Sequence, residues 1–393
     1  MSKNERLSIH KSLSLQSVLT ELGTVATLSF EDALPIPAAV NHSKEFFDHE
    51  LKSIFLKEWI CVGREDEISN VGDFLTHEVA GVSILIVRQT NGSIISFINA
   101  CAHRFARLVQ EKSGNTNRFM CPYHAWTYNI GGELVRAPYM EMKNCFDKKA
   151  NGLRQVNTEI WEGFVYINLA KEKPKKVSSR LKFLKEEVVG RYDMASYKTV
   201  MRKTMAWDAN WKNLIENFTE SYHVPIAHKK TFALHKKPLE VYYCGEDSDH
   251  FCYHRAVQEA DTGSGAAHPK NIRLKGEWRR MMVDCCVFPC QLITLMPDFL
   301  WYITVLPLDI GRFEATWGVA IPPEVLADIP SSEYKNWLSE LSKYMDTAND
   351  EDKILVQALN QGSASTILPK GTLHPIEKNL WQFTKYLHKM CQI

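Results

Sequence analysis

Four residues that bind metal ions well stand close together in the first third of the chain. They form Cys101-x-His103 and, after seventeen residues, Cys121-x-x-His124. Two thiolates and two imidazoles are typical ligands of a [2Fe–2S] cluster or of a zinc ion. Common zinc patterns keep the cysteines in one half and the histidines in the other, whereas each half here contains one of each. The pattern therefore favours the cluster, with a structural zinc knuckle as the alternative.

Such a cluster carries both thiolates on one iron and both imidazoles on the other. Because imidazole is neutral, the cluster has less negative charge than one with four thiolates, and its reduction potential is higher. This suits it to accept electrons from an ordinary ferredoxin or flavin and to pass them on. Aromatic residues surround the two pairs: Phe105, Tyr123, Trp126 and Tyr128.

A second group of potential ligands begins about a hundred residues later. Apolar residues recur at helical spacing from Trp211 to Tyr222 and predict an amphipathic helix that Pro225 ends. Glu220 and His223 would be neighbours on its surface, and His228 would lie on the following turn. Two imidazoles and one carboxylate form the facial set that binds non-haem iron(II) and leaves positions open for oxygen. A third ligand is therefore needed.

Asp352 is the candidate for that ligand. Asn349 looks like the N-cap of a helix, and Asp350 and Glu351 look like cap and dipole partners in its first turn. Asp352 shares the inward face with Val356, where a carboxylate is costly unless it meets a cation. Alone, a histidine pair is more often a surface or core pair and such an aspartate more often a cap. The upstream cluster strengthens the metal interpretation, because its electrons need an acceptor.

The pattern of elements predicts an α+β fold in two domains. Val/Ile-rich segments at 82–87 and 94–98 flank the turn pair Asn91-Gly92 and predict a hairpin. We expect a leader at 1–44, a small antiparallel β domain at 45–170 and a second domain at 171–393, after a charged linker at 170–176. The expected helices and strands outside the hairpin are 46–59, 165–169, 200–207, 241–253, 283–296, 301–306, 313–321 and 334–345.

Composition excludes several classes of function. The formal net charge of +1 gives no electrostatic reason to expect nucleic acid or a membrane surface as a partner. The polar N-terminus has no apolar signal region, and no stretch approaches 20 uninterrupted apolar residues. The ten cysteines do not form a small secreted framework, and we expect Cys285, Cys286 and Cys290 to be buried free thiols. A soluble, cytoplasmic protein is expected.

Together these motifs resemble the large (alpha, terminal oxygenase) subunits of Rieske non-haem iron oxygenases, and they occur in family order. The resemblance implies a Rieske [2Fe–2S] domain followed by a helix-grip (START-like) catalytic domain, on which the leader packs. The residues that carry the resemblance are Cys101–Arg104, Cys121–Tyr128, Asn210–His223, His228 and Glu351–Asp352.

The resemblance also implies roles for the metal ligands. Cys101 and Cys121 would hold one iron of the cluster, and His103 and His124 would hold the other. A mononuclear Fe(II) would be bound by three further residues, namely His223, His228 and Asp352.

An acidic residue links the two metal centres in this family. Glu220 occupies that place, and it would hydrogen-bond His124 of one subunit and His223 of the next. Such a link requires a cyclic oligomer, and a homotrimer is expected. Asn217 would support the site.

The chain departs from the family pattern at three positions. Many members have Arg at the position of Ala102, Gly at that of Phe105 and Asp at that of Glu220. A glutamate at 220 is similar to members that act on small quaternary ammonium compounds such as carnitine.

The reaction implied is oxidation of a small organic substrate with O2. Electrons would come from NAD(P)H through a separate reductase, alone or with a ferredoxin, since the sequence shows no nicotinamide or flavin fingerprint. The substrate would be a quaternary ammonium compound or a polyketide-antibiotic intermediate, and an aromatic-ring hydroxylating dioxygenase is an alternative. An alternative of another class is a zinc-stabilised ligand-binding protein without turnover.

The aromatic residues that could enclose a cation are Trp207, Trp278, Trp301, Trp317, Tyr302 and Phe313.

Overall fold

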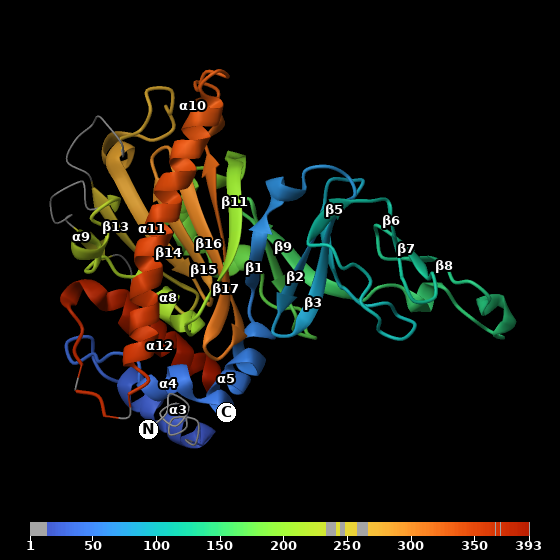
Figure 1. Cartoon of the computed structure of the whole chain (residues 1–393), viewed down its shortest axis with the longest axis horizontal. Helices are drawn as coiled ribbons and strands as arrows, with labels where there is room; N and C mark the ends of the chain where they lie inside the picture. Colours follow the sequence, from blue (N-terminus) through green and yellow to red (C-terminus); the bar gives the residue numbers. More distant parts are fainter. Residues whose placement is uncertain are drawn as a thin grey trace. The chain divides into compact units, whose positions relative to one another are not determined.

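The computed structural model in Figure 1 describes residues 14–232, 241–243, 248–257, 266–365, 367–369 and 371–392. These residues form two compact units. We call Phe55–Val177 the cluster unit, and the described residues of Met1–Ile54 and Ser178–Ile393 the iron unit. The cluster unit begins later than residue 45 because helix α5 (Lys44–Glu50) packs against α3 (Leu15–Ala26) and α12 (Lys378–Cys391) of the iron unit.

The cluster unit is built from two antiparallel sheets, of seven and three strands. The larger has the strand order β1-β10-β9-β4-β3-β2-β5, and the smaller β6-β7-β8. The predicted hairpin is confirmed, since β3 and β4 pair from Ile84↔Ile98 to Arg88↔Ile94. The elements are β1 (Ile60–Arg64), η2 (Glu65–Ile68), β2 (Asp73–Val79), β3 (Val82–Arg88), β4 (Ile94–Ile98), β5 (Ser113–Asn115), β6 (Arg118–Met120), β7 (Thr127–Asn129), β8 (Leu134–Arg136), η3 (Met140–Met142), η4 (Lys149–Asn151), β9 (Gln155–Trp161) and β10 (Phe164–Asn168).

The iron unit contains a second seven-stranded antiparallel sheet, with the order β11-β17-β16-β15-β14-β13-β12. The predicted strand 283–296 is in fact two strands, which a turn joins. Of the predicted strand 241–253, residues 244–247 lie outside the described part. The strands are β11 (Lys198–Trp207), β12 (Val241–Tyr243), β13 (Phe251–Val257), β14 (Met281–Val287), β15 (Gln291–Met296), β16 (Phe299–Asp309) and β17 (Arg312–Ile321).

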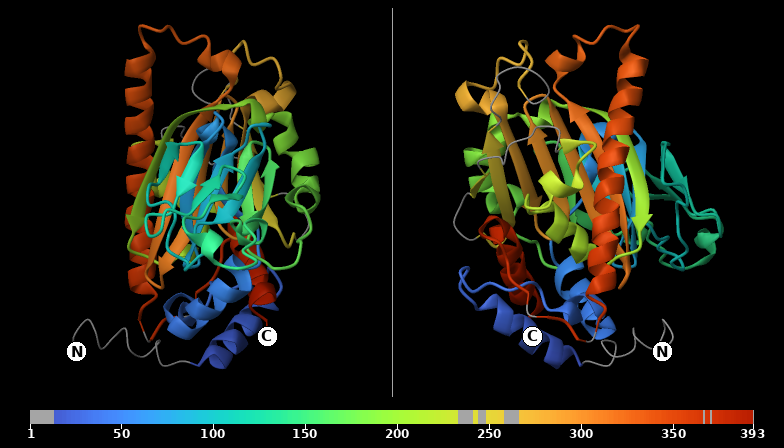
Figure 2. Two further views of the ribbon diagram at one scale, coloured as in Figure 1. Left: turned by 90° about the vertical axis from the view of Figure 1, so that its right-hand side faces the viewer. Right: turned by 60° about the vertical axis from the view of Figure 1, so that its left-hand side comes forward.

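Helices cover one face of this sheet. Contacts join α8 to β16, α11 to β11 and α12 to β13, and Figure 2 shows the long α11 running along the strands. The helices and turns of the iron unit, besides α3, α5 and α12, are α4 (Ala38–His42), η1 (Leu51–Phe55), α6 (Val177–Arg180), α7 (Lys182–Glu187), η5 (Val189–Arg191), η6 (Met194–Ser196), α8 (Trp211–Phe218), α9 (Val224–Ala227), η8 (Gly276–Arg280), α10 (Pro323–Leu326), α11 (Tyr334–Gly362) and η9 (Pro375–Glu377). The α+β class with antiparallel sheets is thus confirmed.

Two of the predicted helices have different bounds. Helix α8 ends at Phe218 rather than at Tyr222, because the Asn379 amide donates a hydrogen bond of 3.0 Å to the carbonyl of its C-cap, Thr219. Pro225 does not end this helix. It lies in the first turn of α9, where the missing N–H costs nothing. The helix expected over 46–59 is α5, followed by the π-helix η1.

The predicted helix start at Asn349 is wrong. Helix α11 is continuous from Tyr334 to Gly362, and Asn349 is buried in its middle. Its side-chain amide donates to the Met345 carbonyl at 2.8 Å, so it makes a contact within the helix and caps nothing. Asp350 to Asp352 are therefore mid-helix residues.

The N-terminal segment is attached to the rest of the iron unit by a hydrogen bond and a buried ion pair. Trp381 donates to the Leu28 carbonyl at 2.9 Å. The Lys212 ammonium lies 2.8 Å from the Glu50 carboxylate, and both side chains are fully buried. Residues 1–13 of the predicted leader lie outside the described part. Among all the described residues, no helix has the length and apolar character needed to cross a membrane.

Candidate metal centres

The two Cys/His loops of the cluster unit share one backbone arrangement. In each loop, the backbone amide four residues after the cysteine donates a hydrogen bond to the cysteine carbonyl. The backbone amide of the cysteine donates to the carbonyl five residues after it. The distances are 2.9 and 2.9 Å at Cys101, and 3.0 and 2.7 Å at Cys121. The residues four positions on, Phe105 and Ala125, both have positive φ, at 63° and 54°. The loops are thus two copies of the same turn.

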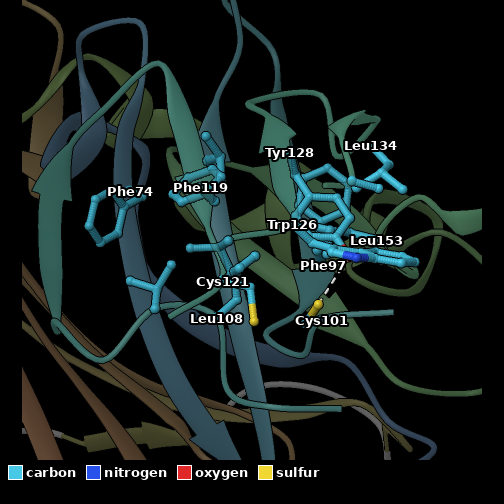
Figure 3. Close-up of a cluster of buried hydrophobic side chains, with 14 residues drawn as sticks. Phe74, Phe97, Cys101, Leu108, Phe119, Cys121, Trp126, Tyr128, Leu134 and Leu153 are labelled. Atoms are coloured by element: carbon cyan, nitrogen blue, oxygen red, sulfur yellow. Dashed lines mark hydrogen bonds between the residues drawn. The ribbon is translucent and has the colours of Figure 1, made fainter. Parts of the chain in front are cut away.

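Cysteines and histidines separate by depth in these loops. Cys101 and Cys121 are only 1% and 2% exposed and belong to the hydrophobic cluster in Figure 3. The rings of His103 and His124 lie 4.6 Å apart, and His124 is exposed. The thiols thus lie in the core, while the paired imidazoles lie nearer the surface, with His124 exposed and His103 half-buried against Trp126. Two thiols and two imidazoles grouped in this way match the two ends of a cluster with mixed ligands.

Tyr128 contacts one of the thiols. Its hydroxyl lies 3.3 Å from Cys101 Sγ and accepts a hydrogen bond of 3.0 Å from the Ala102 amide. Burial raises the pKa of Cys101, so a bound cation is what would hold this cysteine as a thiolate. The chemistry of the donor set therefore fits a metal cluster.

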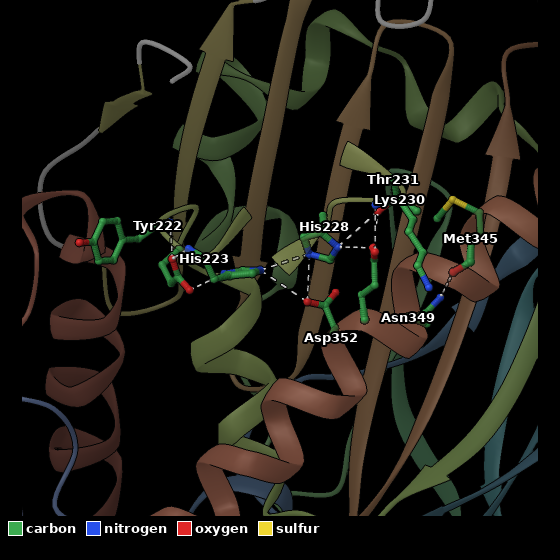
Figure 4. Close-up of polar contacts among 10 residues, drawn as sticks. Tyr222, His223, His228, Lys230, Thr231, Met345, Asn349 and Asp352 are labelled. Carbon is green, nitrogen blue, oxygen red and sulfur yellow. Dashed lines mark hydrogen bonds and ion pairs between the residues drawn. The ribbon is translucent and has the colours of Figure 1, made fainter. Parts of the chain in front are cut away.

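In the iron unit, three donor atoms from distant parts of the sequence converge (Figure 4). Nε2 of His228 lies 3.3 Å from Nε2 of His223 and 3.1 Å from Oδ1 of Asp352. Oδ1 of Asp352 lies 3.5 Å from Nε2 of His223. A single first-row metal ion with bonds of about 2.1 Å spans ligand atoms about 3.0–3.4 Å apart. The triangle therefore has the size of one metal site.

Two carboxylates fix the orientation of the imidazoles. His223 donates from Nδ1 to Glu220, whose other oxygen accepts the His223 amide at 3.1 Å. His228 donates from Nδ1 to Glu351 at 3.1 Å, and Glu351 also accepts from the Thr231 hydroxyl at 2.6 Å. With Nδ1 donating to its carboxylate, each ring directs its Nε2 toward Asp352. This is how carboxylates orient metal-binding histidines.

The electrostatics of the triangle favour a cation. Burial lowers the pKa of His223, but contact with Asp352 and Glu220 outweighs it and raises the value to about 9. Burial would raise the pKa of Asp352, but both histidines lower it. Oδ1 of Asp352 is buried and makes no hydrogen bond of acceptable geometry to the described residues. The attraction that holds protons on these imidazoles would hold a divalent metal ion in their place, so the residues fit a mononuclear iron.

Glu351 was misassigned from the sequence. Its carboxylate binds His228, Thr231 and the Lys230 amide, so its role as a helix-dipole partner is wrong. The helix at this point is already three turns or more long, and its dipole acts only in the first turn. Nothing local in the sequence points to a histidine 123 positions away.

Glu220 and His223 were expected on the surface of one helix, but they lie in the turn that follows α8. Glu220 and His223 do contact each other, as expected, but through a turn in which the Glu220 carboxylate accepts the amides of Tyr222 and His223. Asn217 is buried on α8, and its side chain makes no hydrogen bond to another described residue. Its supporting role stays a prediction.

Of the six aromatic residues considered for a cation cage, Trp301 lies near the triangle. Its ring centroid is 6.0 Å from Phe218 and 6.0 Å from Phe232, and Phe232 is 5.0 Å from His228. Trp207 and Phe313 contact each other in the buried core, and Trp278 stacks with Arg191. The Phe218 and Phe232 contacts were not anticipated.

Two family models match the chain. The ring hydroxylating alpha subunit (catalytic domain) matches residues 194–393, and the Rieske [2Fe-2S] domain matches residues 58–147. The first of these alone covers half of the chain.

Named relatives come from bacteria and a plant. The carnitine monooxygenase oxygenase subunit of Escherichia coli (strain K12) is 34% identical over 199 residues, 50% of this chain and 53% of that protein. The glycine betaine monooxygenase oxygenase subunit of Pseudomonas aeruginosa (strain UCBPP-PA14) is 34% identical over 51% of this chain and 46% of that protein. The chain thus matches about half the length of these relatives. The chloroplastic choline monooxygenase of Arabidopsis thaliana is 26% identical over 99% of this chain and 91% of that protein.

Solved structures share the fold. A quaternary ammonium Rieske monooxygenase has a TM-score of 0.79 at 22% identity, covering 95% of this chain and 98% of that chain. The naphthalene 1,2-dioxygenase of Rhodococcus sp. has a TM-score of 0.78 at 22% identity, covering 99% and 98%. The chain therefore belongs to the Rieske oxygenase alpha subunits, with a Rieske [2Fe–2S] domain followed by a ring-hydroxylating catalytic domain.

Proposed function

We propose that this chain is the terminal oxygenase component of a Rieske oxygenase system that oxidises a small quaternary ammonium compound with O2. The observation that carries the proposal is the convergence of His223, His228 and Asp352 in a chain that also holds two equivalent Cys/His loops. A redox carrier would need only the loops, and a zinc-stabilised binding protein would need neither a second site nor its oriented imidazoles.

In this proposal Cys101, Cys121, His103 and His124 hold the cluster, and His223, His228 and Asp352 hold the iron. When bound, these groups supply electron transfer and O2 activation, which no side chain here can provide. The buried cysteines would keep water from one side of a bound cluster. The exposed His124 would be accessible to a partner.

Glu220 is the residue that we expect to connect the two centres. Its carboxylate is only 10% exposed and binds His223 within the chain. We propose that it also accepts a hydrogen bond from His124 of the partner subunit in a homotrimer. In one structural relative, a quaternary ammonium Rieske monooxygenase, the solved structure gave insights into inter-subunit electron transfer in that protein.

The relatives favour the ammonium substrate over the alternatives. Carnitine, glycine betaine and choline, the compounds in their names, share a trimethylammonium group. A C–H bond of such a compound, O2, two electrons and two protons would give C–OH and one water. Hydroxylation next to nitrogen gives a cationic carbinol, whose C–N bond breaks to release an aldehyde, a neutral amine and the hydroxyl proton. The electrons would come from NAD(P)H through a separate reductase.

The test is turnover by the iron-loaded protein with a surrogate reductase. Carnitine, glycine betaine and choline would each be offered with NADH, and product, O2 uptake and NADH oxidation would be measured together. We expect product from at least one, with one O2 consumed per product. A colourless protein with stoichiometric zinc, or product only from aromatic rings, would contradict the proposal.

A further inference from the structure

The turn between α8 and α9 carries both the proposed electron-transfer residue and the first of the proposed iron ligands. We call Thr219–His223 the ligand turn. Figure 4 shows His223 pointing from this turn toward His228 and Asp352. The apolar spacing of α8 continues to Tyr222, so the local sequence would allow the helix to extend through the turn. Contacts from elsewhere in the fold must therefore end it.

Continuation of α8 would require one particular hydrogen bond. In an α-helix each amide donates to the carbonyl four positions earlier, so the His223 amide would donate to the Thr219 carbonyl. Both groups have other partners in this structure. The buried Asn379 side chain donates to the Thr219 carbonyl at 3.0 Å, and the His223 amide donates to the Glu220 carboxylate at 3.1 Å. The helical hydrogen bond is thus replaced at both of its ends.

Contacts with the sheet of the iron unit hold Asn379 in position. Its amide nitrogen lies 3.3 Å from Nδ1 of His254 on β13, and Nε2 of His254 lies 3.2 Å from the Asp284 carboxylate on β14. Asp284 also accepts a hydrogen bond of 2.5 Å from the Thr294 hydroxyl on β15. A row of contacts therefore connects three strands of the sheet to the carbonyl at which α8 ends.

A second contact with the ligand turn comes from the residues just before Asn379. The exposed His374 ring stacks on Tyr222, with ring centroids 4.4 Å apart and ring planes 9° apart. His374 and Asn379 belong to one short stretch, because η9 leads directly into α12 and a capping box joins His374 to Glu377. The C-terminal stretch 374–379 therefore contacts the ligand turn at two points.

We infer that Asn379 is a positioning residue for the proposed reaction, because it ends α8 and so holds Glu220 and His223 in the turn. This inference rests on the proposed function and assigns a role to a residue outside the proposed metal ligands. Without the Asn379 donor, the buried Thr219 carbonyl would lack a partner, which costs free energy. The His223 amide is the donor that an extended helix would supply. Pairing these two groups would lengthen α8 and turn the His223 ring away from the other two ligands.

Asn379→Ala tests this role through iron affinity. The mononuclear iron would be removed from the holoenzyme with a chelator, and Fe(II) would be titrated back without oxygen. We expect the Kd of Fe(II) to rise about tenfold, as for other residues that orient metal ligands, while the cluster absorbance stays unchanged. Reoxidation of the reduced cluster in a single turnover, with O2 and the ammonium compound that the wild type oxidises, should slow by about tenfold or more.

Thr384→Ala is the matched control. Thr384 is buried on the same helix, and its hydroxyl donates to the Leu380 carbonyl at 2.9 Å, so its removal costs stability through a hydrogen bond that lies within α12. Thermal unfolding measures this stability. We expect a lower Tm in both variants and a weaker iron affinity in Asn379→Ala alone. An equal rise of the Kd in both variants would show that Asn379 supports only the general packing of α12, and would overturn the inference.

His374→Ala tests the second contact at an exposed position, where the fold is not at risk. Loss of the stacked ring should raise the Kd of Fe(II) about threefold. If Asn379→Ala does not fold, His374→Ala decides alone, and an unchanged Kd then overturns the inference.

The outcomes separate the positioning role from the proposed function. If the wild type binds Fe(II) and turns over an ammonium compound, but Asn379→Ala matches it in Kd and in reoxidation rate, the positioning role is wrong and the proposed function stands. If the wild type binds no Fe(II) besides its cluster, the proposed function fails and the positioning role fails with it.

Discussion

The two proposed metal-binding regions of this chain are built in opposite ways. The cluster loops take four donors from 24 consecutive positions, 101–124, and each loop closes through its own backbone hydrogen bonds. The proposed iron triangle joins His223 and His228, which local backbone hydrogen bonds hold close together, to Asp352, which lies 129 positions after His223. No local hydrogen bond sets the distance between the histidines and Asp352. The first site is therefore a property of short segments, and the second depends on the packing of α8 against α11.

Contacts far from the proposed metal site hold α8 in place against α11 and the N-terminal segment. The Asn210 amide, at the start of α8, donates to the Asn360 side chain of α11 at 3.0 Å. Glu50 binds Lys212 and accepts from Trp211 at 2.6 Å, all in the buried interior. We therefore expect the iron site to be sensitive to substitutions far from the metal, and the cluster site to be much less so.

The largest effect should come from Asp352→Asn. Loss of the anionic donor should abolish mononuclear iron binding and product formation, while the visible absorption of the cluster stays unchanged because its ligands lie in another unit. Metal analysis, absorption and turnover measure the three properties. Asp350→Asn, an exposed neighbour on α11, is the control and should behave as the wild type. Retained turnover in Asp352→Asn would remove Asp352 from the ligand set.

Lys212→Met should cause the largest loss of stability. Removing one partner of a buried ion pair leaves an uncompensated charge, so we expect the free energy of unfolding of the iron unit to fall by about 3–5 kcal/mol. Denaturant unfolding with tryptophan fluorescence measures it. Lys203→Met breaks the exposed pair with Asp346 and should lose about 1 kcal/mol or less. Equal losses of stability in Lys212→Met and Lys203→Met would show that the buried Glu50–Lys212 pair stabilises the protein no more than an exposed pair does.

Glu351→Gln should weaken iron binding without changing the fold. The amide can no longer hold the Nδ1 hydrogen of His228 as strongly, and loss of such a partner lowers metal affinity by about 10–100-fold. Iron titration measures the affinity, and excess Fe(II) should restore turnover. Glu340→Gln, on an exposed turn of the same helix, is the control. Unchanged affinity in Glu351→Gln would mean that Thr231 and the turn alone orient His228.

The smallest effect concerns the cluster loop. Phe105 has a φ of 63° and is 81% exposed, a conformation that glycine adopts without strain and a bulky residue does not. Phe105→Gly should therefore raise the free energy of unfolding of the cluster unit by about 1 kcal/mol, as measured by thermal unfolding. Val71→Gly, at another exposed position, should not stabilise. A loss of stability in Phe105→Gly would show that the ring makes contacts that outweigh the strain.

The same contrast explains what the sequence could predict. The hairpin at 82–98 and the cluster motif depend on residues close in sequence, and both were predictable from turn residues and spacing. The end of α8 was not, because apolar spacing continues to Tyr222 while the contact that stops the helix comes from Asn379. Asn349 has the residue type of a cap, but it is buried in a long helix. Glu351 could be assigned only once its distant partner His228 was in place.

The central claim is that electrons pass from the cluster of one subunit to the iron of the next, through Glu220. Mixed oligomers of Cys101→Ser chains, which lack the cluster, and Asp352→Asn chains, which lack the iron, test it most directly. Neither variant alone should turn over substrate. After co-expression and double-tag purification, oligomers that contain both chains should regain a substantial fraction of wild-type turnover, because an intact cluster then faces an intact iron site. Mixed oligomers that hold both metals yet remain inactive would contradict the account.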